Sequence, residues 1–136
     1  MQSRAVSHEL RAILAVITAA LILASAARAT DKEKLLHNFT GGRDGATSAA
    51  GPIRDAAGNL YGVTTAAGDM SCNNGLGCGT VFKLTPGGTE TVLYTFTGGS
   101  DGSTPSGDLL LEGRRLYGTA SYAGTNGNGV VFSLRK

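Results

Sequence analysis

An internal duplication constrains the fold of this chain more than any other feature of its sequence. Residues 92–102 closely repeat residues 35–45, and both stretches end in Gly-Gly-x-Asp-Gly. Two further motifs follow in the same order in each copy: Leu-Tyr-Gly at 60–62 and 116–118, and Val-Phe-x-Leu at 81–84 and 131–134. A glycine-marked period near fifty residues is typical of repeat architectures, in which neighbouring units bury a shared core.

The first 29 residues have the features of a secretory signal peptide. Arg4 and Arg11 supply a positive n-region, and residues 12–24 form an apolar run too short to span a bilayer. Ala27-Arg28-Ala29 is an A-x-A cleavage site. We therefore expect Sec-dependent export, a mature chain that begins at Thr30 without a membrane span, and a periplasmic or extracellular location. A retained N-terminal anchor is the alternative.

Composition excludes some partners. The segment 1–29 holds three of the 12 basic and one of the 10 acidic residues, so the mature chain has nine of each. A chain with no net charge and no basic stripe is not expected to bind nucleic acid or an anionic membrane surface. All 21 glycines lie in residues 30–136. This density opposes helices, because each interior glycine costs about 1 kcal/mol relative to alanine.

The remaining pattern predicts short strands separated by glycine-rich turns, with no apolar run of helical period. We expect one lone strand at 35–40, a set of four strands at 52–54, 60–67, 80–84 and 91–97, and three more strands in the second copy. The predicted class is all-β in one domain, 30–136. It contains two four-stranded antiparallel β-meander repeats, about 35–90 and 92–136, that resemble propeller blades. A small sandwich or barrel is the alternative.

Three motifs carry a resemblance to a known family: Leu-Tyr-x-Phe-Thr-Gly-Gly-x-Asp-Gly, Asn-Leu-Tyr-Gly-x-Thr and Gly-Thr-Val-Phe-Lys-Leu-Thr-Pro. In this order, over residues 35–136, they resemble the GloVer-type tandem repeat of bacterial choice-of-anchor surface proteins. The resemblance implies export and a repetitive, propeller-like β fold, and it implies no enzymatic activity or catalytic residue. The expected function is a non-enzymatic binding or structural scaffold. A lectin-like carbohydrate-binding propeller is the second hypothesis, and a polysaccharide-active enzyme is the third.

The two cysteines, Cys72 and Cys78, lie in a loop rich in glycine and asparagine, and the corresponding loop of the second copy, 124–129, lacks the six residues that carry them. In an exported chain this pair predicts a local disulfide that rigidifies the loop. A metal site would need more ligands, and the mature chain has a single histidine, His37. His37 takes the place of Tyr94 in the second copy. We expect its ring to fill an aromatic position, with a general base as the alternative.

The recurring Asp44 and Asp101 are candidate ligand residues. A Ca²⁺ ion needs roughly 6–8 oxygen ligands, and each loop offers a single carboxylate, so no cofactor is expected and Ca²⁺ is the weaker alternative. Asp-Gly turns explain the recurrence more simply. In that interpretation at least one glycine of each Gly-Gly pair, 41–42 and 98–99, has a positive φ.

Other candidate ligand residues lie near loop ends. The tyrosines are candidate platforms for a sugar ring: Tyr61, Tyr117 and Tyr122. Asparagines of the loops are candidate glycan contacts, with turn formation as the alternative: Asn59, Asn73, Asn74, Asn126 and Asn128.

The number of repeats predicts self-association. Propellers close with roughly 4–8 blades, whereas this chain encodes two. We therefore expect a head-to-tail homo-oligomer, with a trimer preferred and a glycan as the candidate ligand. A monomeric sandwich is the competing outcome.

Intact-mass measurement of the exported protein tests the processing hypothesis. The expected mass is that of a chain beginning at Thr30. A product that still contains residues 1–29 would contradict the cleavage site and support a retained anchor.

Overall fold

The computed structural model describes residues 32–136. The predicted signal peptide, 1–29, and the expected mature terminus at Thr30 lie outside the described residues. Leu35–Lys136 form one folded unit. Its regular elements are strands, apart from a single 3-10 turn, η1 (Asn73–Gly75). Across residues 32–136, no helix is long and apolar enough to cross a membrane.

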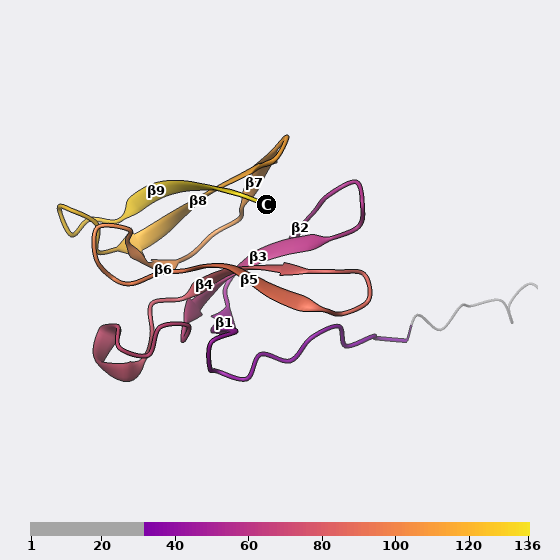
Figure 1. Ribbon diagram of the computed structural model, residues 1–136, viewed down its shortest axis with the longest axis horizontal. Coiled ribbons are helices and arrows are strands. Elements are labelled where there is room, and N and C mark those ends of the chain that lie inside the picture. Colours follow the sequence, from indigo (N-terminus) through magenta and orange to yellow (C-terminus); the bar gives the residue numbers. More distant parts are fainter. Residues whose placement is uncertain (1–31) are drawn as a thin grey trace, which may run out of the picture. The chain divides into compact units, whose positions relative to one another are not determined.

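The first part of this unit is one antiparallel sheet, the first sheet (Figure 1). Its strands are β1 (Ala46–Ser48), β2 (Ile53–Arg54), β3 (Leu60–Ala66), β4 (Thr80–Leu84) and β5 (Glu90–Thr95). The short strands β1 and β2 pair with opposite ends of β3. On its other edge β3 pairs with β4, and β5 pairs with the outer edge of β4.

The second sheet repeats this arrangement without the last strand. Its strands are β6 (Ser103–Pro105), β7 (Leu110–Glu112), β8 (Arg115–Tyr122) and β9 (Val130–Arg135). β6 and β7 pair with opposite ends of β8, and β9 pairs with its other edge. No strand among residues 32–136 pairs with the outer edge of β9. The two meander-like sheets confirm the predicted all-β class.

The strand predicted at 35–40 is absent, and this is the main correction to the expected strand order. Its counterpart β5 is a strand because its backbone pairs with β4. A strand is defined by its ladder to a neighbour, and no described strand lies in register beside 35–40. The short edge strands β1 and β6 were not predicted. Each has only two register partners, and β6 contains Pro105, which reads as a strand breaker.

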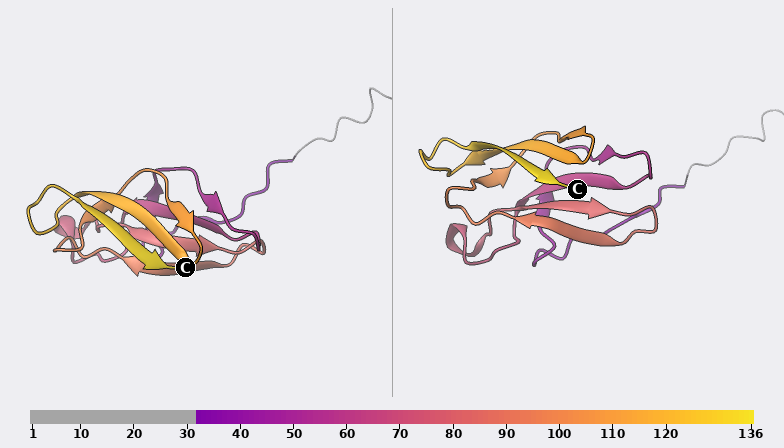
Figure 2. Two further views of the ribbon diagram at one scale, coloured as in Figure 1. Left: turned by 90° about the horizontal axis from the view of Figure 1, so that it is seen from above. Right: turned by 45° about the horizontal axis from the view of Figure 1, so that its top comes forward.

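The two sheets lie against each other (Figure 2). Apolar side chains of both sheets are buried in one cluster. The first sheet contributes Tyr61, Val63 and Val81, and the second contributes Leu116 and Ala120; none of the five is more than 2% exposed. Partly buried side chains of β9 pack against this cluster: Val130, Phe132 and Leu134. Full burial of a Val- or Leu-sized side chain contributes about 1.5–3 kcal/mol. Burial of these side chains between the sheets therefore contributes a large share of the free energy that stabilises the fold.

The repeated Leu-Tyr-Gly motif has a packing reason. Gly62 lies opposite Phe82 in the register of β3 and β4, and Gly118 lies opposite Phe132 in that of β8 and β9. A Cβ atom at either glycine would lie 2.5 Å from the Cζ atom of the facing phenylalanine. The ring thus covers a bare backbone on the neighbouring strand, as in aromatic rescue of a strand glycine. Glycine and phenylalanine recur together because a side chain at the glycine position would clash with the facing ring.

The Gly-Gly-x-Asp-Gly motif forms the same turn twice. Gly41 has φ +79° and Gly98 has φ +76°, which confirms the expected positive φ in each glycine pair. Their N–H groups donate to the carbonyl oxygens of Gly45 and Gly102, at 3.2 and 3.1 Å. The surroundings differ. A Cβ at Gly41 would meet nothing within 4 Å, whereas one at Gly98 would lie 2.5 Å from Sγ of Cys72.

This difference predicts unequal effects of the same substitution. Gly41→Ala should lower the free energy of unfolding by about 1–2 kcal/mol, the cost of a left-handed alanine. Gly98→Ala should lower it by about 1–3 kcal/mol more, because the added methyl overpacks the disulfide. Gly99→Ala is the control, since its Cβ would meet only ordinary contacts. Denaturant unfolding measures all three. Equal losses for Gly41→Ala and Gly98→Ala would contradict the contact between turn and disulfide.

Candidate functional site

The recurring aspartates hold the turns in which they lie. In the first repeat the backbone N–H and the hydroxyl of Thr40 donate to Asp44, at 2.7 and 2.6 Å. In the second, the same groups of Thr97 donate to Asp101, at 2.9 and 2.7 Å. Desolvation is the largest single influence and raises the pKa of each carboxyl. The hydrogen bonds that each carboxylate accepts, first among them those from threonine, together hold its pKa below the usual value. Over residues 32–136, no cluster of three or more His, Cys, Asp or Glu is arranged to hold a metal ion.

His37 lies in an aromatic contact. Its ring meets Phe39 edge-on with centroids 4.8 Å apart, just as Tyr94 meets Phe96 at 5.1 Å in the next repeat. Nε2 of His37 lies 3.7 Å from Oδ2 of Asp44, beyond hydrogen-bond distance. The ring thus occupies the place that a tyrosine takes in the second copy, as the sequence predicts.

Asn59 and Tyr61, candidate ligand residues by sequence, belong to a polar network around Asp55. The side-chain amide of Asn59 donates to both carboxylate oxygens of Asp55, at 3.3 and 3.1 Å. The phenol of Tyr61 donates at 3.0 Å and the ammonium of Lys136 at 3.2 Å. The pKa of Asp55 is well below its usual value, and the side-chain hydrogen bonds from Asn59 are the largest cause. Burial and the Asp55 carboxylate raise the pKa of Tyr61 to about 12.

The three candidate tyrosine platforms differ in exposure. Tyr61 is 2% exposed and faces the core, and Tyr117 is half-buried. Tyr122, at the end of β8, is 63% exposed. A ring that stacks on a ligand must present a face to solvent. Tyr122 is therefore the tyrosine of these three that is available for binding.

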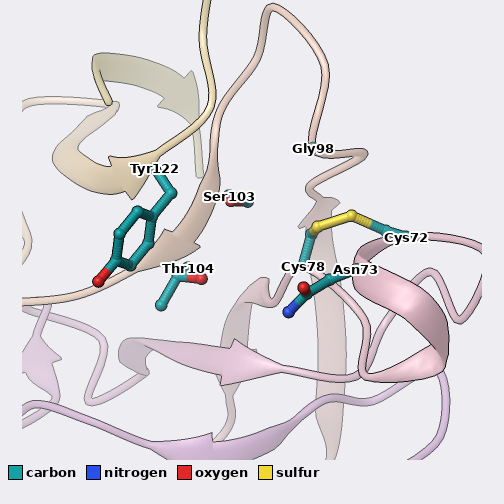
Figure 3. A pocket seen from close by; sticks show the side chains of 7 residues that line it. All are labelled: Cys72, Asn73, Cys78, Gly98, Ser103, Thr104 and Tyr122. Carbon is teal, nitrogen blue, oxygen red and sulfur yellow. A yellow bond between two sulfur atoms is a disulfide. The ribbon is translucent and has the colours of Figure 1, made fainter. Parts of the chain in front are cut away.

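Tyr122 lies at the rim of an open pocket of about 430 Å³ (Figure 3). The lining residues come from both repeats: Cys72, Asn73, Cys78, Gly98, Ser103, Thr104 and Tyr122. Figure 3 shows the Tyr122 ring on one side and Asn73 with the disulfide on the other, with Ser103 and Thr104 between them. The pocket thus presents hydroxyl groups, an amide and an aromatic ring to a common space.

The insertion in the first repeat builds one wall of this pocket. Cys72 and Cys78 form the predicted disulfide, with Cα atoms 5.7 Å apart. Backbone hydrogen bonds tie the insertion to the sheet, with Ala67 N–H donating to the Leu76 carbonyl at 2.7 Å. Thr104, which lies between the insertion and Tyr122, donates its N–H to the carbonyl oxygen of Cys78 at 2.9 Å. Because the second repeat lacks these residues, it has no equivalent wall.

Thr104 has φ +54°, an unusual value for a β-branched residue. Its counterpart Thr47 in the first repeat has φ +58° and does not line the pocket. The strained conformation therefore belongs to the repeat architecture and does not mark a ligand site. The sequence predicts Asn73 and Tyr122 as separate candidates, and no sequence motif indicates Ser103 or Thr104. The sequence feature that points to the pocket is the insertion in the first repeat, because length differences between repeats map to loops on one face.

The lining of this pocket offers neutral hydrogen-bonding groups and one aromatic face, and it contains no carboxylate, ammonium or guanidinium group. Fold and pocket together define a class: an all-β tandem-repeat protein in which one disulfide-bearing loop breaks the repeat symmetry.

The chain belongs to the Gloeobacter/Verrucomicrobia repeat family, whose model matches residues 23–136. This match confirms the tandem-repeat resemblance at the level of the family. No curated protein and no solved structure matches the chain.

The Asp55 network predicts that the free energy of unfolding falls as the pH is lowered into the acid range. Because the pKa of Asp55 is lower in the folded than in the unfolded state, its contribution is present above pH ~4, the unfolded pKa, and is lost as pH falls through the folded pKa. Asp55→Asn should therefore reduce the free energy of unfolding at pH 7, with a smaller difference from the wild type at pH 3. Asp108→Asn, at an exposed carboxylate, is the control. Thermal unfolding at both pH values checks this, and a difference that does not change with pH would contradict the network.

Proposed function

We propose that this protein is an exported, non-enzymatic binding module whose ligand contacts the pocket between the insertion loop and β6. The observation that carries the proposal is the joining of Asn73, Thr104 and Tyr122 in one open pocket. Asn73 comes from the disulfide-bonded insertion of the first repeat, and Thr104 and Tyr122 come from β6 and β8 of the second repeat. Loops on a rigid scaffold are where binding residues concentrate.

Export is supported by two independent features. The sequence of residues 1–29 has the pattern of a secretory signal. The Cys72–Cys78 disulfide suits an oxidising compartment, because cytosolic reductants keep most thiols free. The proposal places the module in the periplasm or at the cell surface.

The propeller-like arrangement is part of the same proposal. Each sheet has the meander order of a blade, with the sheets packed face to face through Val81 and Leu116. In this arrangement each chain supplies two blades of a larger ring. Repeated pockets on such a ring would bind a polymeric ligand multivalently, which raises its apparent affinity without new contacts.

Carbohydrate is the ligand class that the pocket favours. A sugar offers a hydrogen-bearing face that packs on an aromatic ring, and hydroxyl groups that pair with amides and hydroxyls. Tyr122 supplies the ring, and Asn73, Ser103 and Thr104 supply the polar groups. No charged ligand is required, because no side chain that lines the pocket carries a charge.

A glycan array probed with the purified protein tests this function. We expect Tyr122→Ala to weaken binding at least about tenfold, a loss of about 1.4 kcal/mol, because the stacking surface is removed. Leu76→Ala is the matched control: Leu76 is 65% exposed on the same insertion but does not line the pocket. Binding to no glycan, or equal losses in both variants, would overturn the carbohydrate assignment. Release of reducing sugars from a polysaccharide panel would overturn the non-enzymatic assignment.

A further inference from the structure

The two sheets differ by one strand. In the first sheet β5 covers the outer edge of β4, with Val81 opposite Tyr94 and Phe82 opposite Val92. In the second sheet the corresponding edge of β9 carries no strand among residues 32–136. An uncovered edge presents unpaired N–H and C=O groups and is a template for another strand.

A groove lies at the place of the missing strand. It has a volume of about 310 Å³ and runs along residues 130–134 of β9, with Tyr94, Phe96 and Asp101 on its other side. β4 has a strand at the corresponding place, where β5 fills the space beside it. The groove is therefore the empty counterpart of the β5 position.

The sequence that matches β5 exists once more in the chain, at 35–40. Phe39 meets Phe82 of the first sheet edge-on at 5.0 Å, as Phe96 meets Phe132 of the second sheet at 5.1 Å. The segment thus has the same relation to the sheet that follows it as β5 has. β5 also pairs with a strand of the sheet that precedes it, namely β4. Residues 35–40 have no such strand beside them within the described residues. Within one chain β9 does not fill that place (Figure 1).

The exposed side chains fit the same missing neighbour. Val131 is 80% exposed, whereas Val81, at the same repeat position, is 0% exposed. Leu110 is 63% exposed, and its counterpart Ile53 packs against the core. Leu35 is 66% exposed. In the first sheet Val81 and Ile53 are covered because the second sheet packs on that face.

We propose that residues 35–40 of one copy pair with β9 of a second copy and complete its second sheet, as β5 completes the first. The register follows from β4 and β5 by repeat equivalence: His37 lies opposite Val131, Asn38 opposite Val130, and Leu35 opposite Phe132. The outer face of the second sheet then packs on the first sheet of the copy that donates the segment. This covers Val131 and Leu110 with the contact that already covers Val81 and Ile53.

The contact is head-to-tail, so each copy uses one donating and one accepting surface. Heterologous contacts of this kind form rings when the rotation closes and open filaments when it does not. Three copies, with six sheets, fall within the roughly 4–8 blades of closed propellers. The pairing does not depend on the ligand of the pocket, because neither β9 nor residues 35–40 line it.

Light scattering coupled to size exclusion tests the association. We expect the wild-type protein to have a multiple of the single-chain mass and Val131→Glu to have the single-chain mass. Val131 is exposed in one copy, so a charge there leaves the fold intact, and native circular dichroism checks this. Thr125→Glu, in the exposed loop before β9, is the control and should keep the wild-type mass. A wild-type protein with the single-chain mass at about 100 μM, or a Val131→Glu variant that remains associated, would overturn the proposal.

Cross-linking tests the register. Two single variants, His37→Cys and Val131→Cys, are mixed, exchanged and oxidised. A disulfide between these variants can form only between two copies. The expected result is a covalent heterodimer on non-reducing gels. The shifted pair, Leu35→Cys with Val131→Cys, should give several-fold less. Absence of the heterodimer, or equal yields from both pairs, would overturn the register.

Discussion

The contact between the two sheets is the interaction on which the rest of this structure depends. Val81, Tyr61 and Val63 are buried because the second sheet covers them. A unit of a few short strands has two apolar faces and cannot cover both by itself, so stacked repeats bury a continuous core that one repeat lacks. The contrast between two residues at the same repeat position follows from this. Val81 is 0% exposed because the second sheet covers it, and Val131 is 80% exposed because no described sheet covers it.

Most of the residues that recur in both repeats have a structural role in the strands and turns. Gly62 and Gly118 accommodate a phenylalanine ring from the next strand, and Asp44 and Asp101 accept hydrogen bonds within their own turns. Repetition of a carboxylate is therefore explained by backbone geometry without any reaction. The features that suit binding lie where the repeats differ, in the disulfide-bearing insertion and the pocket it forms with β6 and Tyr122.

Electrostatics adds a second link between the repeats. Lys136, the last residue, reaches Asp55 in the first repeat and lies over the ring of Tyr61, 5.8 Å from its centroid. A partly buried ion pair of this kind is stabilising when further hydrogen bonds satisfy the carboxylate oxygens. Asn59 and Tyr61 donate these hydrogen bonds to Asp55. The network thus joins the last residue of the second repeat to Asp55 and Tyr61 of the first repeat.

The sequence by itself determined the features that depend on local chemistry. Glycine spacing set the all-β class, the repeat period and the positive φ of Gly41 and Gly98, and the isolated pair Cys72 and Cys78 predicted its own disulfide. Tertiary structure decided the rest. Residues 35–40 have the sequence of a strand but no partner, because a ladder requires a second backbone that no local pattern provides. Tyr61 and Tyr117 share one motif, yet only Tyr61 is fully buried, because burial depends on which face another sheet covers.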